Sequence, residues 1–140
     1  MDRRRARNPP SRPLVLIIDG HDDTRDLYIE ALSRLRFEVT AVDDDAHAYE
    51  HAWELRPDII VTELTLPQSN AWQLLHRVKS DPRTRGIPVV VVTGDAAPEV
   101  RERAEREGCA AFFVKPCLAD ELAIELRQLI ERTADATASY

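Results

Sequence analysis

The stretch Leu14-Val15-Leu16-Ile17-Ile18-Asp19 is a continuous apolar run that ends on a carboxylate. Such a run is typical of a parallel strand that is covered on both faces. Three later apolar runs each lead into one polar residue as well, namely Glu63, Thr93 and Lys115. Because the carboxyl ends of parallel strands open on one edge of a sheet, we expect these four side chains to converge on one pocket.

Apolar runs and amphipathic stretches alternate along the whole chain. The runs predict five short strands, at residues 14–18, 37–42, 59–61, 89–92 and 112–114. Helical spacing predicts five helices, of which the first is expected to begin at a cap formed by Asp22 or Asp23. The side chains that this first helix is expected to bury are Leu27, Ala31, Leu32 and Leu35. The alternation predicts an α/β fold with a doubly wound parallel sheet.

The size and composition of the chain fit one globular domain. It has 140 residues, of which 44% are hydrophobic and 31% are charged. No apolar run approaches the roughly 18 residues of a membrane span, so we expect no membrane contact. The two cysteines, Cys109 and Cys117, indicate reduced thiols in a cytoplasmic protein rather than a disulfide framework or a metal cluster.

Charge is distributed unevenly between the start of the chain and its body. The net charge is −6, yet residues 1–12 carry five arginines and a balance of +4, which leaves −10 on the other residues. We predict a disordered basic arm at 1–12, a folded domain at 13–132 and a polar tail at 133–140. The acidic body argues against nucleic acid as a partner, and the arginine arm is the one segment suited to it.

The four pocket residues outline a site for phosphoryl transfer to a carboxylate. Such a transfer needs a nucleophilic carboxylate, a hard cation held by further carboxylates, a hydroxyl donor and a lysine. Asp19 is a candidate metal ligand, and Glu63 stands where the nucleophile belongs. Thr93 offers the hydroxyl and Lys115 the positive charge. No G-x-x-x-x-G-K-[ST] or G-x-G-x-x-G motif occurs in the sequence, so nucleotide binding has no support.

Four motifs in order make the chain resemble the receiver domain of two-component response regulators, from about Pro13 to Arg132. The motifs are Ile18–Arg25, Pro57–Pro67, Pro88–Gly94 and Phe112–Pro116. The steps of 30 residues from Glu63 to Thr93 and of 22 residues from Thr93 to Lys115 match the spacing of the family. The resemblance implies a flavodoxin-like (βα)5 three-layer sandwich, with sheet order 2-1-3-4-5.

The resemblance also implies roles for individual residues. It places a cis peptide bond between Lys115 and Pro116, and it makes Thr93 and Phe112 the hydroxyl and aromatic switch positions. It further implies that protein partners bind the face formed by the fourth helix, the fifth strand and the fifth helix. These partners would be a histidine kinase, a phosphotransfer protein or an output protein, and a homodimer is a further option.

The sequence departs from the family pattern at the residues that carry its chemistry. Glu63 replaces the acceptor aspartate, and Gly20 replaces the second acid of the pair that begins at Asp19. The longer side chain displaces the carboxylate by on the order of 1 Å, a misplacement that can cost about a hundredfold in rate. A site made of Asp19, Glu63 and Thr65 would hold Mg²⁺ weakly, because this cation tolerates displaced ligands poorly. We therefore expect no required cofactor, and Mg²⁺ only as a weakened ligand.

These departures lead to one functional hypothesis and several alternatives. We expect a stand-alone pseudo-receiver with no enzymatic activity and no catalytic residue, acting in two-component or phosphorelay signalling through protein contacts. In this hypothesis a contact of Glu63 with Lys115 or Thr93 partly imitates the phosphorylated state. The alternatives are a decayed site that holds no state, a conventional Mg²⁺-dependent phosphorylated receiver, and a small flavodoxin-like ligand-binding protein.

Overall fold

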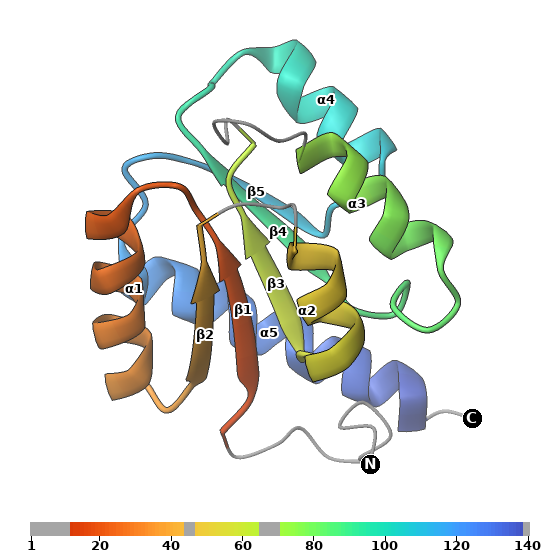
Figure 1. Ribbon diagram of the computed structural model, residues 1–140, viewed down its shortest axis with the longest axis horizontal. Helices are drawn as coiled ribbons and strands as arrows, with labels where there is room; N and C mark the ends of the chain where they lie inside the picture. Colours follow the sequence, from red (N-terminus) through yellow and green to blue (C-terminus); the bar gives the residue numbers. More distant parts are fainter. Residues whose placement is uncertain (1–11, 44–46, 65–70, 139–140) are drawn as a thin grey trace.

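A five-stranded parallel sheet forms the centre of the molecule (Figure 1). The computed structural model describes residues 12–43, 47–64 and 71–138. The strands are β1 (Leu14–Ile18), β2 (Glu38–Val42), β3 (Ile59–Thr62), β4 (Val89–Thr93) and β5 (Ala111–Val114). Their order, β2-β1-β3-β4-β5, confirms the predicted doubly wound, flavodoxin-like sheet.

Five helices cover the two faces of this sheet and complete three layers. They are α1 (Asp22–Arg34), α2 (Ala48–Leu55), α3 (Ala71–Ser80), α4 (Pro98–Arg106) and α5 (Ala119–Ala138). The helices α1 and α5 pack on one face, and α2 and α3 pack on the other (Figure 1). The helix α4 lies beside α3, where the Arg103 guanidinium sits 4.2 Å from the centre of the Trp72 ring. None of the described helices combines the length and the hydropathy that crossing a membrane requires.

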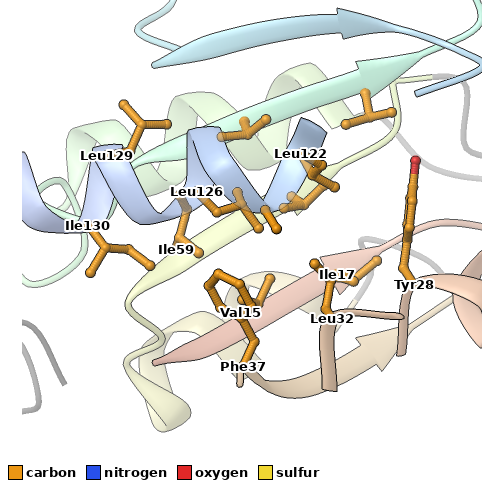
Figure 2. Packing of buried hydrophobic residues seen from close by; sticks show 14 residues of the cluster. Val15, Ile17, Tyr28, Leu32, Phe37, Ile59, Leu122, Leu126, Leu129 and Ile130 are labelled. Carbon is orange, nitrogen blue, oxygen red and sulfur yellow. The ribbon is translucent and has the colours of Figure 1, made fainter. Parts of the chain in front are cut away.

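The strand β1 supplies side chains to both layers of the core. Val15 and Ile17 point into the cluster with α1 and α5, which Figure 2 shows from close by. Leu16 and Ile18 point the other way, into the cluster with α2 and α3. All four side chains are buried. Burial on both faces explains why this strand is apolar throughout, and each such side chain contributes about 1.5–3 kcal/mol to folding.

The buried face of α1 differs from the predicted one. Leu32 is buried as predicted and Tyr28 is buried beside it, whereas Leu27 is 59% exposed and Leu35, the C-cap residue, is 36% exposed. Successive residues are turned by about 100° around a helix, so choosing Leu27 instead of Tyr28 rotated the predicted stripe by one position. The aromatic ring of Tyr28 packs in the core while its hydroxyl donates to the carbonyl oxygen of Cys117 at 3.1 Å.

The start of α1 and the end of α5 differ from the predicted boundaries. The N-cap of α1 is His21, so Asp22 and Asp23 lie in the first turn of the helix. Their negative charges interact favourably there with the positive end of the helix dipole. The predicted polar tail from residue 133 is wrong at its start, because α5 continues to Ala138. Ala134 is buried one turn beyond the buried Ile130, so the apolar stripe extends the helix past the predicted end of the domain. The predicted basic arm lies, apart from residue 12, outside the described residues.

The register of α1 can be tested with a pair of leucine variants. We expect Leu32→Ala to lower the free energy of unfolding by about 2–5 kcal/mol, because it opens a cavity in the core. The matched variant Leu27→Ala should stay within about 0.5 kcal/mol of wild type, because that side chain is largely exposed. Urea denaturation of dilute protein, followed by circular dichroism, measures both. Equal losses in the two variants would contradict this register.

Candidate functional site

The structure brings together all four residues that were predicted to share a pocket. Asp19 directly follows β1, Glu63 follows β3 and Lys115 follows β5, while Thr93 is the last residue of β4. The backbone ladder continues past the strand ends, since the Glu63 amide donates to the Ile18 carbonyl at 2.9 Å. The Lys115 amide likewise donates to the Thr93 carbonyl at 2.8 Å. These bonds fix the side chains at one edge of the sheet.

Lys115 joins two carboxylates that are almost completely removed from solvent. Its Nζ lies 2.9 Å from Asp19 Oδ2 and 3.3 Å from Glu63 Oε2. The Asp19 side chain is 5% exposed and that of Glu63 is 1% exposed, whereas the Lys115 side chain is 23% exposed. Two negative charges and one positive charge therefore share a pocket that opens to solvent chiefly on the lysine side.

The pKa shifts in this cluster agree with that arrangement. Burial raises the pKa of Asp19, but hydrogen bonds from Lys115 and from His21 outweigh it, so the pKa lies below its usual value. Burial lowers the pKa of Lys115, but its hydrogen bond to Asp19 and the charge of Glu63 outweigh it, so the pKa lies above its usual value. Both directions favour the ion pair.

The other carboxylate oxygen of Glu63, Oε1, accepts a hydrogen bond from a hydroxyl. Thr93 Oγ1 donates to Glu63 Oε1 at 2.9 Å, and both residues are buried. The same hydroxyl oxygen accepts from the backbone amide of Asp95 at 3.3 Å. Asp95 in turn accepts the backbone amide of Ala97 on its Oδ1 at 3.0 Å, and Ala97 is the N-cap of α4. The Glu63 carboxylate is thereby linked to the start of α4 through three consecutive hydrogen bonds.

Sequence reasoning missed two residues that hold Asp19. His21 donates its backbone amide to Asp19 Oδ1 at 2.9 Å, and His21 Nδ1 lies 3.0 Å from the same oxygen. Arg25 donates to the carbonyl oxygen of Asp19 at 2.6 Å and also pairs with Asp22. The amide bond from the residue two positions later is a common turn of aspartate, so that contact could have been found from the sequence. The arginine contact depends on how α1 approaches the strand end, which no local pattern indicates.

The donor set of the described residues fits a magnesium ion poorly. Each carboxylate oxygen of Asp19 and Glu63 already has a polar partner within 3.3 Å. The partners are a hydroxyl, a backbone amide, an imidazole and the Lys115 ammonium. Gly20 offers no side-chain oxygen, and Thr65 lies outside the described residues. Within the described part of the chain, no group of three or more His, Cys, Asp or Glu residues is placed to hold a metal. Mg²⁺ requires a near-octahedral set of oxygens, and the two described carboxylates already share the Lys115 ammonium.

The remaining expectations from the resemblance concern β5. The Lys115–Pro116 peptide bond is cis, as the resemblance implied. Phe112 is half-buried in β5, and the Arg101 guanidinium of α4 lies 5.0 Å from the centre of its ring. The predicted aromatic switch position therefore contacts α4, while the predicted hydroxyl switch position faces the pocket.

Comparison with known proteins places this geometry in a family. A model described as the response regulator receiver domain matches residues 15–127. The two-component response regulator ORR11 of Oryza sativa subsp. japonica is 33% identical over 105 residues, which cover 74% of this chain and 71% of that protein. The probable transcriptional regulatory protein TcrX of Mycobacterium tuberculosis is 29% identical, over 88% of this chain and 52% of that protein. The chain thus spans about half of TcrX, and only 8% of the similar hybrid signal transduction histidine kinase D of Dictyostelium discoideum.

Solved structures share the fold at lower sequence identity. A CheY-like response regulator receiver domain protein from Methanospirillum hungatei superposes with a TM-score of 0.83 at 18% identity, covering 90% of this chain and 99% of that one. The chemotaxis response regulator CheY4 of Vibrio cholerae gives a TM-score of 0.78 at 21% identity, covering 84% of this chain and 98% of that one. At such identities these structures support the fold and no finer property.

Removal of the bridging ammonium should produce a pH-dependent loss of stability. We expect Lys115→Met to lower the free energy of unfolding at neutral pH by about 3–5 kcal/mol, because it leaves two buried carboxylates without their cation. The lowered pKa of Asp19 means that its ionised form stabilises the wild type above the usual pKa of an aspartate, and that this contribution is lost as pH falls through the lower pKa of the folded state. Towards pH 4 the wild type keeps this contribution, because the folded pKa of Asp19 lies below the usual value, whereas protonation of the unpaired carboxylates relieves the repulsion in the variant. The gap between them should narrow as pH falls towards about 4.

A second lysine provides the control for this experiment. Lys79 is half-buried and donates to the backbone carbonyls of Ile87 and Arg85 rather than to carboxylates. Lys79→Met should lose a pH-independent amount of stability. Urea denaturation between neutral pH and pH 4 distinguishes the two profiles. A constant deficit for Lys115→Met would contradict the bridging role.

Proposed function

The chain belongs to the response regulator receiver domain family, and from this membership we propose that it is a pseudo-receiver, which signals through protein contacts while Glu63 carries no phosphoryl group. Receiver domains are signalling modules of two-component systems and interact with histidine kinases and output proteins. In our proposal the contacts of Glu63 with Thr93 and Lys115 take the place of the phosphorylated state. The rival reading is a conventional receiver that is phosphorylated on Glu63 with Mg²⁺.

The engagement of both Glu63 oxygens is the observation that carries this proposal. A carboxylate that attacks phosphorus must present an oxygen in line with the leaving group. Glu63 Oε1 accepts the Thr93 hydroxyl, Oε2 faces the Lys115 ammonium, and the residue is 2% exposed. An attack would have to break the hydrogen bond from Thr93 or the ion-pair contact with Lys115.

Charge supports the same conclusion. A phosphoryl group would bring about −1.5 to −2 charges into the pocket. The pocket already holds two carboxylates against one ammonium, and Asp19 and Glu63 share that single cation. At an effective dielectric constant of 20, two unit charges about 4 Å apart interact by roughly 4 kcal/mol. Among the described residues, Lys115 is the one cation that contacts both carboxylates, so an added phosphoryl group would have to share its charge with them.

A series of hydrogen bonds connects Glu63 with the exposed helix α4. Thr93 is held towards the pocket by Glu63, and through Asp95 it is connected to Ala97 at the start of α4. In our proposal this chain of bonds holds α4 in the position that partners bind. The partner surface proposed for a histidine kinase, a phosphotransfer protein or an output protein remains the face of α4, β5 and α5. The roles of the arginine arm and the cytoplasmic location stay predictions.

Mass spectrometry of the intact protein tests the absence of phosphoryl transfer. After incubation with Mg²⁺ and acetyl phosphate, we expect the wild type to keep its unmodified mass, because both Glu63 oxygens are engaged. A double variant, Gly20→Asp with Glu63→Asp, restores an acid pair and a shorter acceptor and serves as the matched comparison. It should gain one phosphoryl group under the same conditions. A stoichiometric adduct on Glu63 of the wild type would refute the pseudo-receiver proposal in favour of the conventional one.

Hydrogen exchange tests the route from Glu63 to α4. We expect Thr93→Val to increase the amide exchange rates of α4 (Pro98–Arg106) severalfold, because the variant lacks the hydroxyl that links Glu63 to Asp95. Thr62→Val is the matched control, since Thr62 is equally buried and its hydroxyl donates only to the neighbouring Glu63 carbonyl, at 3.2 Å. The control should leave α4 unchanged. Equal exchange of α4 in wild type and Thr93→Val would mean that the site is decayed and holds no state.

A further inference from the structure

Tyr28 reaches from α1 to the connection between β5 and α5, residues 115–118. The residue is 4% exposed, and its ring packs in the core cluster between α1 and α5. In Figure 2 the side chain projects from α1 with its hydroxyl oxygen at the edge of this cluster. There the hydroxyl donates to the carbonyl oxygen of Cys117 at 3.1 Å. The two residues are 89 positions apart, so one hydrogen bond joins the first helix to the segment that carries Lys115.

Packing of the core accounts for the ring of Tyr28 and not for its hydroxyl. A phenylalanine would present the same ring to the cluster, because it lacks only the hydroxyl group. A buried hydroxyl without a partner would be costly, so its position beside a backbone carbonyl is what makes a tyrosine acceptable here. The hydroxyl therefore has a role outside the core, at the point where it meets the connection after β5.

The phenol also lies within reach of the charges in the pocket. Burial, together with the negative charges of Cys117, Asp19 and Glu63, raises the pKa of Tyr28 to about 12. The phenol thus keeps its proton at neutral pH and remains a hydrogen-bond donor. Both carboxylates that share the Lys115 ammonium act on it, so the hydroxyl lies near the pocket as well as next to the Cys117 carbonyl.

Two contacts hold the backbone around Lys115. The Lys115 amide donates to the carbonyl of the last residue of β4 at 2.8 Å. Two residues later, the Cys117 carbonyl accepts from Tyr28. A lysine side chain is a flexible four-carbon stem, so the place of its ammonium depends on how firmly its backbone is held. The contact from Tyr28 is the one of the two that comes from outside the sheet.

The helix α1 holds the other partner of this ion pair as well. Arg25 donates to the carbonyl oxygen of Asp19 at 2.6 Å. Arg25 and Tyr28 are three residues apart and therefore lie on the same side of α1. One turn of α1 is thus joined to the end of β1 through Arg25 and to the connection after β5 through Tyr28. Asp19 and Lys115, which are 2.9 Å apart, are both located relative to that turn.

We propose that Tyr28 is a positioning residue for Lys115. Its hydroxyl holds the connection after β5 against α1 and thereby keeps the ammonium between Asp19 and Glu63. Without the hydroxyl, the connection moves away from α1 for part of the time, and the ammonium then exchanges the carboxylates for water. The proposal concerns where Lys115 lies and not whether Glu63 accepts a phosphoryl group, so it stands or falls independently of the proposed function.

Competitive acetylation of the full chain measures how firmly Lys115 is held. The chain has two lysines, Lys79 and Lys115, so Lys79 serves as an internal reference. A trace of acetic anhydride reacts with neutral amines only, and peptide mass spectrometry gives the labelling ratio of Lys115 to Lys79. The ion contacts hold the pKa of Lys115 above its usual value, so the paired amine reacts slowly. We expect Tyr28→Phe to raise the ratio severalfold at neutral pH.

Tyr49→Phe is the matched control for this variant. The Tyr49 hydroxyl donates to the Asp81 carboxylate at 2.5 Å, and α2 packs on the other face of the sheet from α1. The control therefore loses a tyrosine hydrogen bond that has no contact with the connection after β5, and it should leave the ratio unchanged. A wild-type ratio in Tyr28→Phe would overturn the proposal. So would equal increases in both variants, which would indicate a general loss of stability.

The two cysteines report on the same segment independently. Cys117 belongs to the connection that Tyr28 holds, whereas Cys109 precedes β5, and both are half-buried. We expect Tyr28→Phe to speed the reaction of the Cys117 thiol with a neutral aromatic disulfide severalfold and to leave that of Cys109 unchanged. Circular dichroism checks that the variants are folded. A faster Cys117 reaction with an unchanged lysine ratio would mean that Tyr28 holds the segment without positioning Lys115, and the proposal would be wrong.

Discussion

The ammonium of Lys115 between Asp19 and Glu63 is the contact on which the pocket depends. Two carboxylates at the ends of β1 and β3 are almost fully buried, and each would be costly to ionise there without a partner. One cation from β5 serves both. The ion cluster therefore ties together the carboxyl ends of three strands. It also determines the chemistry of the site, because a lysine that is shared by two acids leaves the pocket with a net negative charge before any anion arrives.

The extra methylene of Glu63 acts within this constraint. It carries the carboxylate about 1 Å further from the strand than an aspartate would reach. At that distance the carboxylate meets the Thr93 hydroxyl on one side and the ammonium on the other. In the proposed function these two contacts take the place of those that a phosphoryl group would make. Decay of the site and imitation of its occupied state then differ in whether Thr93 transmits the contact to α4.

The sequence predicted the sheet and the pocket because both depend on chain positions that tertiary packing cannot shift. A polar residue at the end of a buried parallel strand must lie at the carboxyl edge, whatever the helices do, so Asp19, Glu63, Thr93 and Lys115 could be placed together without knowledge of their distances. The phase of α1 could not be read in this way, because Tyr28 and Leu27 are both plausible core residues and only the neighbouring α5 decides between them. The contact of Arg25 with Asp19 depends on how α1 approaches the end of β1, which the spacing of residues within one helix does not predict.

The two helical layers differ in how firmly they are attached to the sheet, and this difference separates their roles. The helix α5 buries a stripe of three leucines and one isoleucine, Leu122, Leu126, Leu129 and Ile130, each contributing about 1.5–3 kcal/mol. The helix α4 buries one alanine, and two of its arginines stack on Trp72 and Phe112, contacts that contribute about 0.5–1 kcal/mol each at exposed sites. A hydrogen bond of the strength that links Glu63 to Thr93, about 1 kcal/mol net, is comparable with each of these contacts and small beside the apolar burial of α5. A change in the pocket is therefore expected to shift α4 more readily than α5.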